Sequence, residues 1–149
     1  MKFLCTSELG RLAKWLRAIG YDAIYLEEKV KIPELLALAT TEKRTILTRL
    51  KRLQGHKGTP VIVVASDRVK DQMGELKRAL GIRPTKNRFF ERCILCNVLV
   101  QPVSKEKVKG KVPPYVFETQ TSFSRCPSCK RIYWAATHYG RAKAFVGLS

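Results

Sequence analysis

The stretch "KFLCTSELGRLAKWLRAIGYDAIYL", residues 2–26, predicts a strand, a helix and a second strand in succession. Apolar residues in its middle recur at the spacing of one helix face: Leu9, Leu12, Ala13, Leu16 and Ile19. Thr6 or Ser7 is suited to cap the start of this helix, and Gly20 is suited to end it in a left-handed conformation. The apolar runs on either side, "KFLCT" and "DAIYLE", predict the two strands.

Strands and helices continue to alternate up to Gly81. Pro33 opens a second predicted helix, "TILT" (45–48) predicts a third strand, and "PVIVVAS" (60–66) predicts a fourth strand buried on both faces. A last helix is expected to start at Ser66 or Asp67. This alternation is typical of an α/β fold in which helices cover both faces of a parallel sheet.

The pattern changes at "GIRPTKNRFFER" (81–92), which contains dense charge and no clear period. After it, residues 93–134 read as short strand-like pieces with turn residues and two pairs of cysteines. We therefore expect an α/β domain at residues 1–88. A small module with a basic C-terminal tail is expected at residues 89–149.

Positive charge is the strongest compositional feature. The 149 residues include 29 Lys and Arg against 12 Asp and Glu, a net charge of +17, and the excess is spread over both predicted domains. Such a balance on a folded chain predicts a polyanionic partner, most often nucleic acid, although a merely soluble basic protein is the alternative. We expect no membrane association, no small-molecule substrate, and an intracellular, cytoplasmic location, since neither a transmembrane run nor a signal peptide is recognisable.

Four of the five cysteines form two C-x-x-C pairs, Cys93 with Cys96 and Cys126 with Cys129, separated by 29 residues. This arrangement predicts a tetrahedral zinc site with four protein ligands. Because such a site has no open position, the zinc is expected to be structural. Two disulfides are the alternative, which the expected intracellular location disfavours. Cys5 is predicted to be a small core residue.

The chain also resembles a known family, on the stretches "KFLC…LGRLAKWLRAIGYDAIYL", "RTILTR", "RCILCN…QPVSKEKV", "VPPYVFETQTSFSRCPSCKRIYW" and "THY". These are similar to PIN-like ribonuclease domains followed by a zinc ribbon, the family of the C-terminal RNase domain of a mutator exonuclease. The resemblance covers nearly the whole chain. It implies a PIN-like three-layer fold with a parallel sheet, then a small zinc ribbon.

The resemblance also implies a set of carboxylates at the carboxyl ends of the strands, which hold Mg²⁺ or Mn²⁺ for RNA hydrolysis. Two of these carboxylates are missing: Thr6 follows the first strand, and Leu50 stands where a Thr-Arg-Asp motif is expected. The acids left to form a displaced site are Glu34, Asp67 and Glu8. Asp67 is equally explained as a helix cap, and Glu8 is expected to face solvent.

The main hypothesis is therefore a non-catalytic RNA-binding protein on a degenerate nuclease scaffold, associated with ribosomal RNA and ribosomal proteins. The alternative is a metal-dependent endoribonuclease with a displaced acidic site, and a toxin-like or tRNA-directed factor also stays open. Tyr139 is expected to stack on a base. The basic residues expected to contact RNA are Arg44, Arg49, Lys51, Arg52, Lys57, Lys105, Lys107, Lys109, Lys111, Lys130, Arg131, Arg141 and Lys143.

Overall fold

The computed structural model describes residues 1–84, 86–134, 140 and 144–145. The chain divides into two compact units: Met1–Leu16 with Tyr21–Arg83, and Arg17–Gly20 with Pro84–Ser149. The domain boundary expected after residue 88 stays a prediction. None of the described helices combines the length and the apolar character that a membrane span requires.

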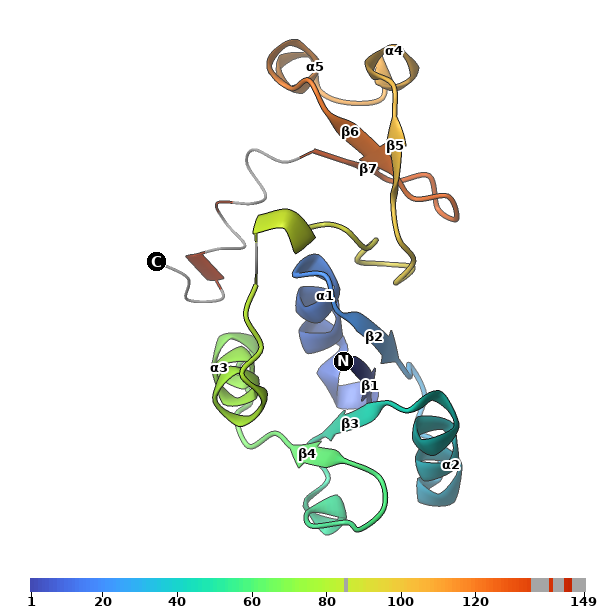
Figure 1. Cartoon of the computed structure of the whole chain (residues 1–149), viewed down its shortest axis with the longest axis vertical. Coiled ribbons are helices and arrows are strands. Elements are labelled where there is room, and N and C mark those ends of the chain that lie inside the picture. Colours follow the sequence, from blue (N-terminus) through green and yellow to red (C-terminus); the bar gives the residue numbers. More distant parts are fainter. Residues whose placement is uncertain (85, 135–139, 141–143, 146–149) are drawn as a thin grey trace. The chain divides into compact units, whose positions relative to one another are not determined.

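The first unit is built on a four-stranded parallel sheet (Figure 1). Its strands are β1 (Lys2–Cys5), β2 (Asp22–Tyr25), β3 (Thr45–Thr48) and β4 (Val61–Val63), in the order β2-β1-β3-β4. The register pairs Cys5 of β1 with Tyr25 of β2 and with Leu47 of β3. The carboxyl ends of β1, β2 and β3 therefore meet at one edge of the sheet.

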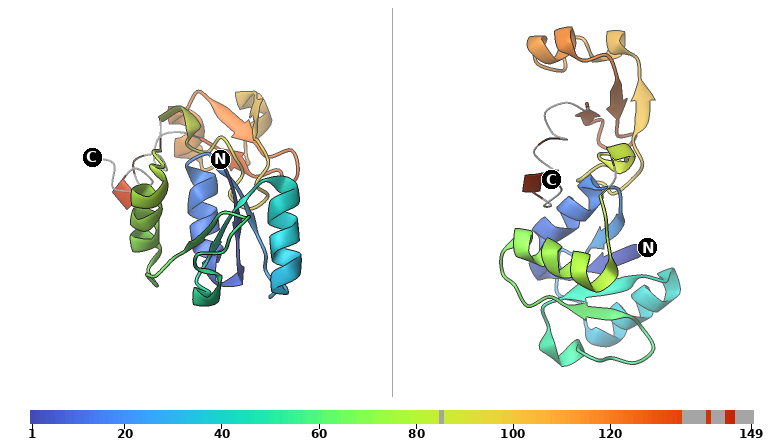
Figure 2. Two further views of the ribbon diagram at one scale, coloured as in Figure 1. Left: turned by 60° about the horizontal axis from the view of Figure 1, so that its bottom comes forward. Right: turned by 60° about the vertical axis from the view of Figure 1, so that its left-hand side comes forward.

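Helices lie on both faces of this sheet: α2 (Ile32–Glu42) covers one face, and α1 (Gly10–Ala18) and α3 (Val69–Leu80) lie on the other (Figures 1 and 2). Short 3-10 turns precede α1 (η1, Ser7–Leu9) and follow β3 (η2, Lys51–Leu53). The core under α2 consists of Leu4, Leu35, Ala39, Ile46 and Leu53. The predicted apolar face of α1, from Leu9 to Ile19, is buried as expected. The α/β prediction is thus confirmed.

Two local predictions in this unit were wrong. The strand β4 is an edge strand, so its three residues are only partly buried rather than enclosed on both faces. The helix α3 begins at Val69 with Arg68 as its N-cap, later than expected. The reason is Glu75: its carboxylate accepts hydrogen bonds from the amides of Ala65 and Ser66, at 2.9 and 2.7 Å, and holds the segment after β4 outside the helix.

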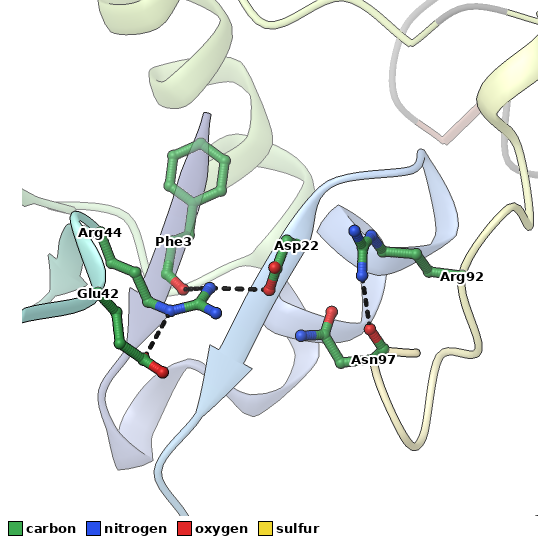
Figure 3. A network of polar contacts seen from close by, with 6 residues as sticks. All are labelled: Phe3, Asp22, Glu42, Arg44, Arg92 and Asn97. Carbon is green, nitrogen blue, oxygen red and sulfur yellow. Dashed lines mark hydrogen bonds and ion pairs between the residues drawn. The ribbon is translucent and has the colours of Figure 1, made fainter. Parts of the chain in front are cut away.

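Arg44 has a structural role. Its side chain is 7% exposed and donates to the carboxylates of Asp22 (2.7 Å) and Glu42 (2.9 Å) and to the carbonyl of Phe3 (3.1 Å; Figure 3). These bonds tie the start of β3 to β1 and β2. Burial alone lowers the pKa of the guanidinium, but the two carboxylates raise it above its ordinary value. The prediction that Arg44 contacts RNA is therefore not supported, because its guanidinium is buried and hydrogen-bonded within the fold.

The second unit contains a three-stranded antiparallel sheet of β5 (Gln101–Val103), β6 (Phe123–Arg125) and β7 (Ile132–Tyr133). A 3-10 turn, η3 (Lys86–Arg88), precedes it. Two short helices that were not expected, α4 (Lys105–Val108) and α5 (Pro114–Thr119), lie between β5 and β6 in the chain (Figure 1). Each helix places one valine, Val108 or Val116, in the core of this unit, together with Val112 and Phe123.

The end of α1 belongs to the second unit. Arg17 is 8% exposed and donates to the carbonyls of Ile94 and Leu95, at 3.0 and 3.2 Å. Gly20 has φ +96°, and a Cβ there would lie 2.7 Å from the Arg88 carbonyl oxygen. Only glycine fits this turn.

Candidate functional site

One carboxylate lies at the carboxyl ends of β1 and β3. Oε1 of Glu8 accepts hydrogen bonds from the hydroxyl of Thr6 at 2.5 Å, the hydroxyl of Thr48 at 3.1 Å and the amide of Arg49 at 2.9 Å. Thr6 directly follows β1 and Thr48 ends β3. Both threonines are buried, whereas Glu8 is exposed overall. The expectation that Glu8 faces solvent is therefore only half right: one of its oxygens is turned back onto the strand ends.

These bonds favour the ionised form of Glu8. Partial burial of its carboxyl raises the pKa, but the hydrogen bonds from Thr6, Thr48 and the Arg49 amide outweigh it and bring the pKa below its ordinary value. A carboxylate held by neutral donors keeps its charge without a cation. Glu8 is thus a charged acceptor whose Oε1 is already fully occupied by three donors from its own chain.

Basic side chains surround this edge. Arg49, Lys51 and Arg52 are exposed, and Arg49 donates to the carbonyl of Ala65 at 3.2 Å. Between them stands Leu50, 36% exposed, whose amide donates to the Thr48 hydroxyl at 3.2 Å. Leu50 occupies the position at which the resemblance placed a metal ligand, and an aliphatic side chain has no ligand atom to offer.

A pocket of about 150 Å³ opens at the same edge. Its polar lining includes Thr6, Glu8, Glu28, Lys29 and Arg52. Its apolar lining is Leu26, Val30, Leu35 and Leu50. Glu34 does not line this pocket; it is exposed on the first turn of α2. Glu28 was missed by sequence reasoning, although its place shortly after Tyr25, the last residue of β2, was a signal that it would reach this edge.

A second hollow, of about 520 Å³, also has Glu8 in its lining. Asp67 lines it, together with Arg11, Arg68 and Lys70. Glu8 is thus shared by two hollows, with Glu28 in one and Asp67 in the other. Within the described part of the chain, no three of the acidic and histidine side chains gather closely enough to hold a metal ion, and the four cysteines form the one such group.

The cysteine cluster is in the second unit. The Sγ atoms of Cys93, Cys96, Cys126 and Cys129 all lie within 4.8 Å of one another, and those of Cys93 and Cys129 are 3.6 Å apart. Tetrahedral zinc with Zn–S bonds of about 2.3 Å requires sulfur atoms roughly 3.8 Å apart. None of the four forms a disulfide. The donor set and the spacing fit a metal such as zinc.

Tyr133 supports one of these sulfurs. Its hydroxyl donates to Sγ of Cys93 at 3.1 Å and accepts from the amide of Ile94 at 3.0 Å, and its ring stacks on Phe90. Burial raises the pKa of the Cys93 thiol, but the Tyr133 hydroxyl and nearby amides donate to it and lower the pKa to about 7. The thiolate, which is the form that binds metal, is favoured here. Tyr133 is 7% exposed and packs with Cys93 and Cys126 inside this unit.

The other residues predicted to contact RNA differ in how exposed their side chains are. Lys57, Lys107, Lys109, Lys111, Lys130 and Arg131 are exposed. Lys105 is half-buried, with its ammonium 4.8 Å from the centre of the Phe117 ring. Tyr139, Arg141 and Lys143 lie outside the described residues.

Comparison with known families identifies the chain. A family model described as "Mut7-C RNAse domain" matches residues 1–146. The chain belongs to this family. No curated protein and no solved structure gives a significant match. The match to the Mut7-C RNase domain confirms the resemblance found in the sequence, and membership in an RNase family implies RNA as substrate or partner.

Proposed function

We propose that this Mut7-C RNase domain binds RNA along the carboxyl edge of its parallel sheet without cleaving it. One observation carries the proposal: the positions that the resemblance assigns to two carboxylates hold Thr6 and Leu50, and Glu8, the acid bonded to these strand ends, has Oε1 occupied by three donors from the chain itself. Hydrolysis of RNA by a divalent ion requires several charged oxygen ligands on one ion.

Exposed cations at the same edge support the RNA-binding half of the proposal. Arg49, Lys51 and Arg52 follow β3 directly, and the chain carries a net charge of +17. Phosphates of single-stranded or looped RNA are the polyanion that such a surface fits best. Exposed Lys57 belongs to the same basic loop, between β3 and β4.

We further propose that the cysteine cluster binds structural zinc. The four thiol ligands leave no open position for a substrate or a water molecule, and Tyr133 stabilises the thiolate of Cys93. Zinc would then hold the two knuckles together in a unit whose apolar core contains only a few residues. A basic ribbon of this kind supplies further RNA contacts, from Lys107, Lys109, Lys111, Lys130 and Arg131.

As a finer proposal, the RNA is ribosomal. A small, strongly basic protein with a zinc ribbon and no complete catalytic site fits a ribosome-bound protein. Sedimentation of ribosomal subunits through a sucrose gradient, at low and at high salt, tests this: the protein should co-migrate with one subunit at low salt. Protein that stays at the top of the gradient while still binding free RNA would contradict the ribosomal partner alone.

Cleavage is the direct test of the catalytic half. Purified zinc-loaded protein, incubated with end-labelled single-stranded RNA and with Mg²⁺ or Mn²⁺, should yield no more product than RNA alone. The cleaved fraction should also be the same for the variant Glu8→Gln, because no acid-dependent activity exists to lose. Metal-dependent cleavage by the unmodified protein that Glu8→Gln abolishes would overturn the proposal.

That outcome would favour the second candidate, a metal-dependent endoribonuclease with a displaced acidic site. The observation behind this candidate is the shared lining: Glu8 faces one hollow with Glu28 and another with Asp67. Glu28→Gln and Asp67→Asn would then distinguish the two hollows, while Glu34→Gln, outside both, would leave cleavage intact.

A further inference from the structure

We infer that the pocket at the carboxyl edge of the sheet holds one unpaired nucleobase of the bound RNA, and that it prefers guanine. This inference rests on the proposed RNA-binding function and adds the base to it. The pocket in question has a volume of about 150 Å³, and its lining includes Glu28, Lys29, Leu35, Leu50 and Arg52. Drug-sized ligands occupy pockets of about 300–1,000 Å³, so this one has room for a single small ring system.

The pocket walls suit the flat face of a base. Leu35, at 2% exposure, forms the inner part, and Leu50 and Val30, at 36% and 37%, are exposed side chains of the lining. Covering exposed aliphatic groups removes their apolar surface from water and so favours binding. Every nucleobase has an apolar face that can cover them. Leu50, which is useless as a metal ligand, therefore has a function here as a wall of the pocket.

The polar lining selects among the bases. Glu28 is exposed and has no hydrogen bond or ion pair with another described residue, so both of its oxygens are free acceptors. Glu8 differs, because its Oε1 is already taken. Lys29 and Arg52 line the same pocket and donate only.

Guanine matches this set of groups. Its Watson–Crick edge presents two adjacent donors, N1–H and the N2 amino group, next to the O6 acceptor, and unpaired bases in RNA are read on that edge. A carboxylate accepts from both donors at once, and a lysine or arginine donates to O6. Adenine and cytosine each present one amino donor beside a bare ring nitrogen, which repels a carboxylate. Uracil presents one N–H between two carbonyl oxygens.

Basic side chains around the pocket are positioned to bind the phosphates of the RNA strand that carries this base. Arg49 and Lys51, on the same loop as Leu50 and Arg52, are exposed to bind phosphates next to the captured base. Arg11, Arg68 and Lys70 line the second hollow together with Glu8 and extend the positive surface there. A single strand can follow this edge with one base turned into the pocket, whereas a base-paired guanine has its reading edge covered.

The experiment measures equilibrium binding of the full zinc-loaded chain to fluorescently labelled RNA octamers. One oligomer is a uridine octamer, and three others carry a single central guanosine, inosine or adenosine. A bidentate contact is worth about 1–3 kcal/mol, so guanosine should bind at least about fivefold more tightly than adenosine. Inosine lacks the N2 amino group and should fall between them. Annealing the guanosine oligomer to its complement should remove the preference.

Matched variants locate the effect. Glu28→Gln should abolish the preference for guanosine while leaving binding of the uridine octamer within about twofold, since the phosphate contacts are intact. Its control is Glu27→Gln, which removes the same charge from the neighbouring exposed residue outside the pocket lining and should keep the preference. Leu50→Asp should weaken binding of the guanosine oligomer more than that of the uridine octamer.

Three results would overturn the inference. Equal affinity for the guanosine and adenosine oligomers, with salt-dependent RNA binding present, would reject the guanine pocket and leave the proposed function standing. A guanosine preference that survives Glu28→Gln would place the reading group elsewhere. Absence of binding to all four oligomers would reject the proposed function and this inference together.

Discussion

Replacing Arg44 by methionine should destabilise the first unit strongly and leave RNA recognition almost unchanged. Methionine keeps most of the aliphatic stem and removes three hydrogen bonds, to Asp22, Glu42 and the Phe3 carbonyl. The variant therefore separates the structural role of this buried cation from the RNA contact that its place in a basic stretch had suggested.

The magnitude follows from the three bonds. The hydrogen bond to the Asp22 carboxylate is worth about 1.5–3 kcal/mol, and a buried carbonyl that loses its donor costs about 1–3 kcal/mol. The Glu42 pair is discounted to at most about 1 kcal/mol, because the Glu42 side chain is 36% exposed and solvent screens it. The contributions are not additive, since one nitrogen serves both Asp22 and Phe3, and Asp22, 21% exposed, regains some hydration. We expect a loss of about 2–4 kcal/mol in the free energy of unfolding.

The assay is urea unfolding of the zinc-loaded protein followed by circular dichroism. Lys43→Met is the matched control: it removes the same charge from the adjacent, exposed residue and should change the free energy of unfolding by no more than about 0.5 kcal/mol. At low urea, where both variants are folded, their affinities for RNA should agree within about twofold. A loss of stability below about 1 kcal/mol, or an RNA affinity that falls only in Arg44→Met, would refute the reasoning.

Four further outcomes are expected. Chelation of zinc should remove the circular dichroism signal of residues 93–134 and leave most of the first unit folded. Unfolding should extend at most to the last turn of α1, where Arg17 donates to the Ile94 and Leu95 carbonyls. A spectrum that stays unchanged after verified metal removal would contradict this. The logarithm of RNA affinity should fall with the logarithm of salt concentration, with a slope of about −4 to −9. Replacing Arg49, Lys51 and Arg52 together by alanine should make that slope shallower by about 2–3. The control, which replaces Lys2, Lys14 and Lys77 together by alanine and removes the same charge, should change the slope less. The variant Thr6→Asp with Leu50→Asp should bind Mn²⁺ measurably more tightly than the unmodified protein, by calorimetry, and equal affinities would argue against the edge as a former metal site. Hydrogen bonds lower the pKa of Glu8 in the folded protein below its ordinary value of 4.5, so the stability that this residue contributes is present above about pH 4.5 and is lost as the pH falls through the lowered pKa. The difference in free energy of unfolding between the unmodified protein and Glu8→Gln, measured by urea titration, should therefore shrink on acidification. A difference that stays constant with pH would contradict this account.

The sequence predicted the arrangement of the first unit because its signals are long and periodic. Leu9, Leu12 and Leu16 mark one helix face, and the apolar runs around Leu4 and Ile46 mark the central strands. The edge position of β4 was not predictable from an apolar run, since pairing partners are set by the whole sheet. The late start of α3 depends on Glu75, a residue two turns into the helix that bonds back to Ala65 and Ser66.

The cysteine cluster was predictable from spacing alone, whereas the groups around the sheet edge were only partly so. The orientation of Glu8 depends on hydroxyls supplied by two different strands, Thr6 and Thr48, which are 42 residues apart in the chain. Glu28 reaches the pocket through a loop without periodicity. The burial of Arg44 depends on Asp22 across the sheet, and nothing in the basic stretch around it distinguishes it from Arg49.

The carboxyl edge of the sheet has Thr6 and Leu50 at the two positions where the resemblance places acids, and this changes the balance of charge there. Two or three carboxylates gathered there would repel one another and would need a cation between them. With Thr6 and Thr48 as donors, the carboxylate of Glu8 is stabilised by neutral groups and needs no cation. The basic residues that follow fit this state better than a metal-bound one: at an effective dielectric constant near 20, a unit positive charge about 6 Å from a divalent ion costs roughly 5 kcal/mol before salt screening. Arg49 and Arg52 beside a magnesium ion would oppose its binding, whereas beside a phosphate they favour it. Thr6 and Leu50, which offer no charged ligand, and the exposed bases beside them therefore act in the same direction: both disfavour a divalent ion at this edge, and the bases favour an RNA phosphate there.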